Sequence, residues 1–383
     1  MRLVYLSPVP WDSFAQRPHK FVEWYHRYTG NTVIWIEPYP VRLPVASDFS
    51  MGLRSVANVA SATPDWLTLI KPHSLPLEPL PGMAWINGLL WKPIFKNVAT
   101  LSQSEPCVLG VGKPSALALG LLRTKCFQAS FYDAMDDFPA FFSGLSKLSM
   151  RRTELAVVRQ VNKVFTSSTA LYARWTKSHS KVTLVRNGLD PSALPLIRKS
   201  SLSSKPKVLG YVGTMGDWFD WSLVTDIALA APGVNIILIG PQHTRPATPL
   251  PSNVMIMPAM AHADAMAAMT QFDAGLIPFQ ISELTESVDP IKYYEYRALS
   301  LPVISTSFGE MRLHAQNPGT FILQKPYKED EILSTIEKVF GYAEPPLAAE
   351  VFIANNTWDI RFEGMKEFLD EPTYTNTTTP RTV

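Results

Sequence analysis

The chain has 383 residues, which is more than one ordinary hydrophobic core needs and is typical of two domains. Hydrophobic residues make up 46% and charged residues 18%, a balance that excludes a largely disordered chain. The formal net charge of +2 excludes a broad surface for polyanions, so no nucleic-acid partner is expected.

Cysteine usage and the N-terminal sequence bear on location. Cys107 and Cys126 are the only cysteines, too few for a disulfide framework, which predicts a reducing cytoplasm. The opening residues MRLVYLSPVPW do not have the pattern of a signal peptide. No window reaches about 18 apolar residues, so no spanning helix is expected. We therefore expect a cytoplasmic protein that can meet the inner face of a membrane only from the side.

Short β-rich runs alternate with longer helical patterns along the first half of the chain, and the same alternation returns in the second half. Strand, helix and strand without hairpin turns predict parallel sheets with helices on both faces. The expected strands are 3–7, 32–38, 107–112, 129–135, 163–168, 207–213, 234–240, 253–258, 273–279 and 302–306, and the expected helices are 21–28, 115–124, 151–162, 223–231, 261–272 and one after 288. The fold class is α/β, with two doubly wound Rossmann-like domains facing each other across a ligand-binding cleft.

Periodicity is lost at residues 191–206, where Ser, Pro and Lys dominate, as in a domain linker. We therefore expect one domain at 1–190 and a second at 207–350. An amphipathic helix within 351–372 would pack back toward the N-terminal domain, and 373–383 would be a flexible tail.

The stretch VDPIKYYEYRALSLPVIST, residues 288–306, reads as a helix feeding a buried strand. Asp289 and Pro290 predict its start, with the Asp side chain as cap. Lys292 in the first turn opposes the helix dipole unless an anion occupies the same place, so free N–H groups and an ammonium predict a site for the diphosphate of a nucleotide-sugar. Glu295 shares that face and could accept both hydroxyls of a ribose. Tyr293 belongs to the same polar turns, and the alternative is a solvated Lys292–Glu295 ion pair.

A second candidate for the donor site is GYVGTMGDWFDW, residues 210–221. A strand ending at Gly213, followed by Thr214 and Met215, allows the backbone to approach a ligand closely, as first βα turns do in nucleotide-binding domains. The sequence is neither GxGxxG nor a P-loop, so this signal has low specificity.

Taken in order, VRNGLD (185–190), GYVGTMGDWFDW, AHADAMAAMTQFDAGLIPF (261–279) and VDPIKYYEYRALSLPVIST resemble segments of GT-B glycosyltransferases over nearly the whole chain. The likeness is greatest to bacterial exopolysaccharide glycosyltransferases of the xanthan glucuronosyltransferase type, and looser to GT4-like enzymes. The resemblance implies a glycosyltransferase of the hexosyltransferase type (EC 2.4), with acceptor binding in the domain 1–190 and nucleotide-sugar binding in the domain 207–350.

Two departures from that family pattern bear on the site. The family motif in the C-terminal domain usually has two glutamates. Glu295 matches the second, and Ser287 stands at the position of the first. Glu286 is one residue out of register with that position. This departure resembles the xanthan-type branch, in which the lysine of this helix contacts phosphate, and it favours Lys292. SPVPWDSFAQRPHKF replaces the usual glycine-rich first loop, where Arg17 and His19 could either contact ligand or start a helix.

FYDAMDDF, residues 131–138, places carboxylates at the end of a strand in the first domain. An inverting glycosyltransferase needs one base near the acceptor hydroxyl. Asp137 directly precedes Phe138-Pro139, as a helix cap would. Asp136 then becomes the candidate base. Xanthan-type enzymes resemble this sequence here and have their base at the matching position. Asp133 is the second choice, and capping or a salt bridge is the alternative for Asp136. No convincing Asp-x-Asp pair occurs, so no metal is required and Lys292 would stabilise the departing phosphate.

Residues 80–101 interleave Trp85, Trp91 and Phe95 with Lys92 and Lys96. Aromatic residues beside lysines suit a membrane interface that bears a lipid-linked acceptor. Core packing of the tryptophans is the simpler alternative, because Pro93 interrupts a continuous amphipathic helix.

The leading hypothesis is transfer of a sugar, with a UDP-sugar as favoured donor, to a glycan or lipid-linked oligosaccharide in bacterial surface-polysaccharide synthesis. One alternative is a GT-B-like epimerase or hydrolase, which would act without an acceptor. The other is a non-catalytic sugar-nucleotide-binding protein, which would bind without turnover and for which the missing signal peptide is unfavourable.

Overall fold

The computed structural model describes residues 1–43, 63–76, 78–80, 83–195 and 206–371 of the chain. These residues cluster into two units. Unit 1 is Met1–Val185 together with the chain from Phe362 onward, and unit 2 is Arg186–Arg361. Positions 196–205 of the predicted linker and the whole predicted tail 373–383 lie outside the described residues.

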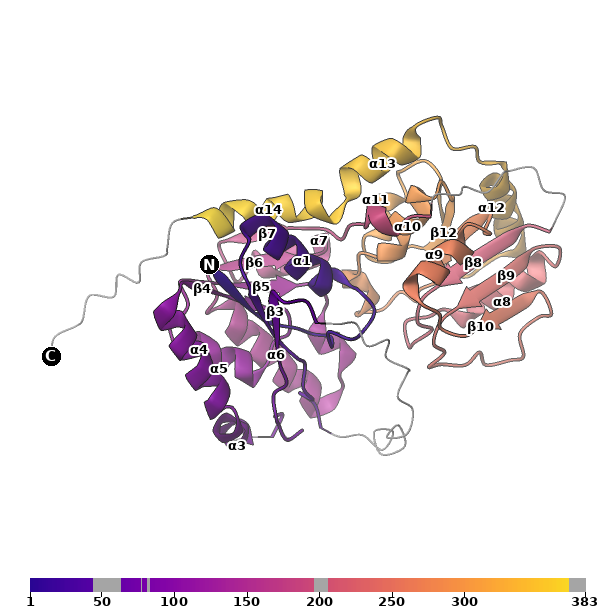
Figure 1. Cartoon of the computed structure of the whole chain (residues 1–383). Helices are drawn as coiled ribbons and strands as arrows, with labels where there is room; N and C mark the ends of the chain where they lie inside the picture. The colour runs from indigo at the N-terminus through magenta and orange to yellow at the C-terminus, as the bar shows by residue number, and fades with distance from the viewer. Residues whose placement is uncertain (44–62, 77, 81–82, 196–205, 372–383) are drawn as a thin grey trace. The chain divides into compact units, whose positions relative to one another are not determined.

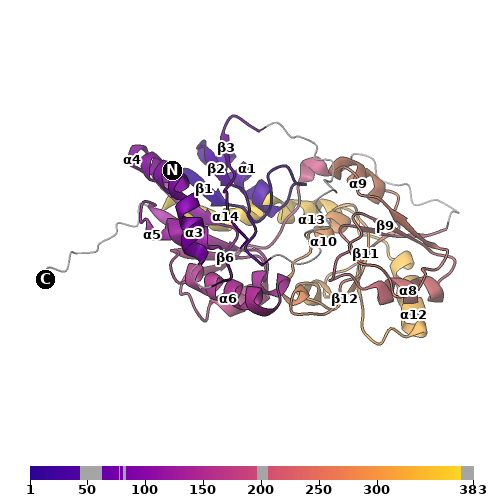
Figure 2. The ribbon, with the colours of Figure 1, turned by 90° about the horizontal axis from the view of Figure 1, so that it is seen from below.

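Unit 1 is built on a parallel sheet in the strand order β3-β2-β1-β4-β5-β6-β7. Its helices lie on both faces of the sheet (Figures 1 and 2). In chain order its elements are β1 Arg2–Leu6, α1 Arg17–Thr29, β2 Val33–Ile36, β3 Leu67–Ile70, α3 Met83–Leu90, α4 Lys92–Ser104, β4 Cys107–Val111, α5 Ala116–Arg123, β5 Ala129–Ala134, the 3₁₀ turn η1 Phe138–Phe141, α6 Gly144–Val158, β6 Lys163–Thr166, α7 Thr169–Trp175, β7 Val182–Leu184 and the later part of α14 Trp358–Asp370.

Side chains of the unit 1 strands alternate between two apolar layers, as period-2 strands require. Val4 and Leu6 pack in the layer covered by α4, α5, α6 and α7. Tyr5, between them, lies against Phe21 of α1 on the opposite face. Phe362 of α14 contacts Phe21 as well, with ring centroids 5.5 Å apart. The last helix therefore completes the second apolar layer of unit 1.

Unit 2 contains a second parallel sheet in the order β10-β9-β8-β11-β12-β13. One apolar layer lies beneath α8 and α12, and the other beneath α9, α10 and α11. Its elements are the turn η2 Pro191–Ala193, β8 Val208–Val212, α8 Trp221–Ala230, β9 Asn235–Ile239, β10 Val254–Met257, α9 His262–Met269, β11 Ala274–Ile277, the turn η3 Thr285–Ser287, α10 Ile291–Ala298, β12 Val303–Thr306, α11 Met311–His314, β13 Thr320–Leu323, α12 Glu329–Gly341 and α13 Ala348–Asn356.

The doubly wound α/β class predicted from the sequence is confirmed in both units. Each predicted strand has a counterpart within two or three residues of its expected bounds. The helix expected at 151–162 begins earlier, at Gly144, and ends at Val158. Within the described residues, no helix has both the length and the apolar character that a bilayer crossing requires.

Candidate active site

Helix α10 begins at Ile291, with Pro290 in an extended conformation as the N-terminal cap residue. The predicted side-chain cap by Asp289 is wrong, because its carboxylate is used elsewhere. One oxygen accepts the backbone N–H of Asn187 at 2.8 Å, and both oxygens lie 3.0–3.1 Å from the hydroxyl of Tyr294. Asp289 thus fixes the start of α10 to a chain segment far away in sequence.

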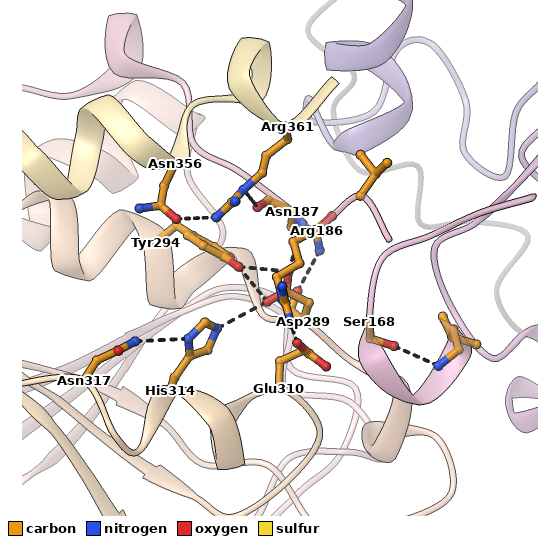
Figure 3. A network of polar contacts seen from close by, with 12 residues as sticks. Ser168, Arg186, Asn187, Asp289, Tyr294, Glu310, His314, Asn317, Asn356 and Arg361 are labelled. Carbon is orange, nitrogen blue, oxygen red and sulfur yellow. Dashed lines mark hydrogen bonds and ion pairs between the residues drawn. The ribbon is translucent and has the colours of Figure 1, made fainter. Parts of the chain in front are cut away.

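Figure 3 shows the wider set of contacts around this carboxylate, which we call the Asp289 cluster: Asn187, Asp289, Tyr294, Asn356 and Arg361. The Asn187 side chain donates to the Asp289 carbonyl at 2.7 Å, and the Arg361 guanidinium donates to the Asn187 carbonyl at 3.0 Å. Arg361 also pairs with Asn356 and lies over the Tyr294 ring, 5.6 Å from its centroid. The first turns of α10 are therefore held by buried, charge-assisted hydrogen bonds.

Lys292 and Glu295 form an ion pair, with Nζ 2.6 Å from Oε2. Glu295 is only 7% exposed, so this is not the solvated surface pair that the sequence left open. His262, at the start of α9, lies 3.4 Å from the other carboxylate oxygen. Burial raises the pKa of Glu295, but the Lys292 charge and bonds from His262 and Lys292 outweigh it, so the net pKa is lowered. Glu295 is thus an ionised hydrogen-bond acceptor near a helix N-terminus.

The other residues of this helix face inward. Tyr293 is fully buried: its ring stacks on His314 at 3.9 Å and its hydroxyl accepts from Asn317. Tyr296 is buried too, and its hydroxyl accepts the Val212 N–H at 3.1 Å, at the end of β8. This bond fastens α10 next to the loop that begins at Gly213.

That loop is packed closely against the loop after β9. Gly213 has φ +155°, and a Cβ at Gly240, which has φ +141°, would lie 2.2 Å from the Gly213 carbonyl oxygen. Met215 is fully buried in the core and bonds through its backbone N–H to Pro241, so it supports the loop rather than facing solvent. Thr214 is partly exposed. Gly213 and Thr214, with Lys292 and Glu295, lie at the same carboxyl edge of the sheet.

Ser287 and Glu286, where the sequence departs from the first glutamate of the family motif, have different surroundings in the structure. Ser287 lies in η3, is 1% exposed, and its hydroxyl has no hydrogen-bond partner among the described residues. Glu286 is partly exposed, and its carboxylate pairs with Arg312.

In unit 1, Asp133 is the last-but-one residue of β5 and is fully buried. The Arg17 guanidinium donates to both of its carboxylate oxygens at 2.8–3.1 Å and to the Val185 carbonyl at 2.7 Å. Both residues are thus committed to a bidentate pair that joins α1 to the sheet.

Both ring nitrogens of His19 also form hydrogen bonds with backbone groups. Its Nδ1 accepts the Gln16 N–H at 3.2 Å, so Nε2 carries the proton that faces the Trp11 carbonyl at 3.1 Å. Burial lowers its pKa, which keeps the ring neutral. The two first-loop candidates, Arg17 and His19, therefore hold the start of α1.

Asp136 differs from its neighbours. It follows β5, is partly exposed, and has neither a hydrogen bond nor an ion pair within the described part of the chain. Burial raises its pKa to about 7. Arg17 opposes that rise, while Asp133 and Asp137 add to it. A carboxylate with a free lone pair and a pKa near neutrality is suited to general-base chemistry.

Asp137 stands at the N-cap position of η1 but makes no capping bond, so that prediction is wrong. Its carboxylate instead accepts from Arg174 of α7 at 2.5 Å. This charge pairing distinguishes the three acids: Asp133 and Asp137 have arginine partners, and Asp136 does not.

His262 was not among the predicted site residues, although it approaches Glu295 from a second helix. The available signal was a histidine in the first turn of the helix predicted at 261–272. The 33-residue separation from Glu295 gave no indication of the contact.

Among known proteins, no family model matches the sequence. TuaH of Bacillus subtilis (strain 168), assigned as a teichuronic acid biosynthesis glycosyltransferase, is 25% identical over 240 residues, which cover 55% of this chain and 58% of TuaH. The chain thus spans less than two thirds of this curated relative.

Among solved structures, Anabaena HepE in complex with UDP and glucose aligns with a TM-score of 0.66 and 14% identity over 97% of this chain and 100% of its own. Sucrose-phosphate synthase from Thermosynechococcus elongatus aligns with a TM-score of 0.63 and 13% identity, over 96% of this chain and 98% of its own. AviGT4, a glycosyltransferase involved in avilamycin A biosynthesis, aligns with a TM-score of 0.59 and 12% identity, over 97% of this chain and 99% of its own.

The two Rossmann-like parallel sheets and these alignments define the class: the chain has the GT-B fold of glycosyltransferase structures. TuaH is a relative that is detectable from sequence alone.

Proposed function

We propose that the protein is a glycosyltransferase that moves a sugar from a nucleotide-sugar to a hydroxyl group of a glycan or lipid-linked acceptor. The observation that carries the proposal is the Lys292–Glu295 pair at the start of α10, held beside the Gly213 loop at the carboxyl edge of a Rossmann-like sheet. The GT-B fold supports it, and so does the similarity to TuaH.

The donor half would work as follows. The first turn of α10 leaves backbone N–H groups unpaired, and Lys292 adds a positive charge, which together suit a diphosphate. Glu295, ionised and nearly buried, would accept the two ribose hydroxyls. Gly213 and Thr214 would approach the ligand, while Met215 and Tyr293 pack the surfaces behind it. Since HepE was solved with UDP, a UDP-sugar is the donor we favour.

In the acceptor half, Asp136 would remove the proton of the acceptor hydroxyl as the sugar transfers with inversion. Arg17 and Asp133 would hold the segment after β5 in place through their bidentate pair. Lys292 would stabilise the negative charge of the departing diphosphate, so the reaction needs no metal. This assignment and the xanthan-type specificity stay predictions.

The setting we propose is synthesis of a bacterial surface polysaccharide, by analogy with the assignment of TuaH to teichuronic acid biosynthesis. Helix α3 supports a peripheral contact with lipid. Trp85 is 70% exposed, and Leu89 and Leu90 are also exposed, next to the exposed basic residues Lys92 and Lys96. Trp91 is buried in the core, so core packing explains only one of the two tryptophans.

Binding of nucleotide-sugars tests the donor half. A thermal-shift screen of UDP-, GDP- and dTDP-sugars should identify a ligand that raises the melting temperature, because a ligand in large excess stabilises the state that binds it. In Lys292→Ala we expect that ligand to bind about tenfold or more weakly, since one charge-assisted contact is lost. Lys338→Ala, at an exposed position of α12, is the matched control.

Equal affinity of Lys292→Ala and the unchanged protein would remove the donor-site argument. Release of free sugar from the donor without an acceptor would instead favour a hydrolase, and a ligand that binds without turnover would favour a binding protein. Transfer to an added glycan distinguishes both from the proposed activity.

A further inference from the structure

The chain segment that carries Asp136 is bonded, on its N-terminal side, to a residue that follows β6. The backbone N–H of Ser167 donates to the Ala134 carbonyl at 3.1 Å, and the Ser167 hydroxyl donates to the Met135 carbonyl at 2.8 Å. Ser167 is fully buried, so these bonds lie in a low dielectric where they are strong. The two residues that precede Asp136 are therefore fixed to the end of the neighbouring strand.

Asp137 fixes the same segment on its C-terminal side. Its carboxylate is 2% exposed, and Oδ2 accepts from Nη2 of Arg174 at 2.5 Å. Arg174 belongs to α7, which begins shortly after Ser167, so both anchors come from one part of the chain. The Asp137 carbonyl also accepts the Ala140 N–H at 2.9 Å. Asp136 thus lies between anchored neighbours, while its own carboxylate has no partner among the residues that the structure describes.

The charges around Asp136 come from two ion pairs. Burial raises the pKa of Asp136 most, and the Arg17 charge opposes that rise. The carboxylates of Asp133 and Asp137 add to the rise, because like charges disfavour ionisation. Arg17 is the bidentate partner of Asp133. Asp137 is therefore the neighbouring acid whose charge is balanced by a different cation, Arg174.

Arg174 also interacts with a second buried acid, Glu154 of α6. Glu154 is 1% exposed, and its Oε1 accepts from the Tyr132 hydroxyl at 2.7 Å. Burial raises the pKa of Glu154 to about 7, and the bond from Tyr132 opposes that rise. The Asp137 charge raises this pKa as well, whereas the Arg174 and Arg151 charges lower it. Arg174 therefore links acids of α6 and of the segment after β5.

We infer that the Asp137–Arg174 pair positions the base: it holds Asp136 in place from the C-terminal side and keeps a negative charge beside it. This inference rests on the proposed function, in which Asp136 takes the proton of the acceptor hydroxyl. Asp137 and Arg174 act through Asp136, so both are positioning residues and not catalytic residues. The pH at which Asp136 can act is then set by a neighbour that takes no part in the transfer.

Carbon-13 NMR of the full chain, labelled at the carboxyl carbon of aspartate, tests the effect of the charge. The Asp136 signal is the one that Asp136→Asn removes, and its titration midpoint should lie near pH 7 in the unchanged protein. Asp137→Asn removes the like charge and leaves Arg174 without this carboxylate, so we expect the midpoint to fall by about one pH unit or more. Asp65→Asn, at an exposed position before β3, is the matched control and should leave the midpoint unchanged.

The rate of sugar transfer tests the positioning. Arg174→Met removes the partner of Asp137 and should lower kcat about tenfold, with KM for the nucleotide-sugar unchanged, because the base is displaced and the donor site is not. Arg174→Lys keeps the positive charge and should recover most of the rate. Arg159→Met, at the exposed C-cap position of α6, is the control. Thermal unfolding checks that each variant folds, and if Arg174→Met does not, the midpoint in Asp137→Asn decides.

An Asp136 midpoint that is the same in Asp137→Asn and Asp65→Asn overturns the inference, and so does a rate of Arg174→Met equal to that of Arg159→Met. The proposed function fails separately. If the midpoint shifts as expected but the unchanged protein transfers no sugar, the pair still sets the titration of Asp136 and the transferase assignment is wrong. If Asp136→Asn abolishes transfer while neither the midpoint nor the rate responds to the pair, the base assignment stands and this inference falls.

Discussion

Replacing Asp136 by Asn should reduce sugar transfer and at the same time make the protein more stable at alkaline pH. The two effects have one cause, a carboxyl group whose pKa the fold moves from 3.8 to about 7. As a base, Asp136 acts only when ionised, so the transfer rate should fall about tenfold for each pH unit below 7. Loss of the base in Asp136→Asn should lower the rate at pH 8 by about 100-fold or more, with donor affinity unchanged.

The effect on stability follows from proton linkage. Because the folded-state pKa lies above that of the unfolded chain, the folded protein binds the extra proton between about pH 4 and pH 7, and stability falls as the pH rises through this window. A rise from 3.8 to about 7 corresponds to about 4 kcal/mol. Asp136 is partly exposed, so water screens part of this penalty, and we expect Asp136→Asn to gain about 1–2 kcal/mol at pH 8 and nothing at pH 4.

Thermal and urea unfolding followed by tryptophan fluorescence at pH 4 and pH 8 measures the stability, and transfer of sugar to a glycan measures the activity. Asp133→Asn is the contrasting variant: it breaks a buried bidentate pair and should destabilise the protein by about 3 kcal/mol at pH 8. The reasoning is refuted if Asp136→Asn transfers sugar at the normal rate, or if it is less stable than the unchanged protein at pH 8.

Two further substitutions test the packing of the donor half. Asp289→Ala leaves a buried backbone N–H and a buried phenol unpaired. It should lower the free energy of unfolding in urea by about 3 kcal/mol and weaken nucleotide-sugar binding. A decrease below about 1 kcal/mol would contradict the role given to this residue. Gly240→Ala places a Cβ against the Gly213 carbonyl and should destabilise by about 1–3 kcal/mol and weaken donor binding, whereas Ala at the exposed Gly233 should leave donor binding unchanged. Normal donor affinity in Gly240→Ala would show that the Gly213 loop does not form part of the site.

The sequence predicts the two sheets well because buried strands such as β4 and β8 are continuous apolar runs between helical patterns. It does less well where a strand is short and partly exposed, and β7, Val182–Leu184, had no apolar run to mark it. Residues of local motifs were placed on the right elements: Lys292 and Glu295 do share one face of a helix.

The errors concern partners that are distant in sequence. Asp289 has the local signature of a helix cap, but its bonds go to Asn187, 102 residues earlier. Asp137 has the same signature, and an arginine 37 residues later takes its carboxylate. In both cases a charge-assisted bond competes successfully with a local cap that contributes about 1 kcal/mol. Tyr293 looked like a ligand contact because it is polar, yet its ring is buried by stacking on His314.

The Asp289 cluster also bears on how this molecule could be rebuilt. Unit 2 is one continuous stretch, Arg186–Arg361, inserted between two parts of unit 1. Its two ends are bonded to each other, Leu189 to Asn356 and Trp358 through the backbone and Asn187 to Arg361. A module whose ends meet can be excised, exchanged or closed into a ring with a short loop. Unit 1 has no such freedom, since Phe362 from the far end of the chain completes its core.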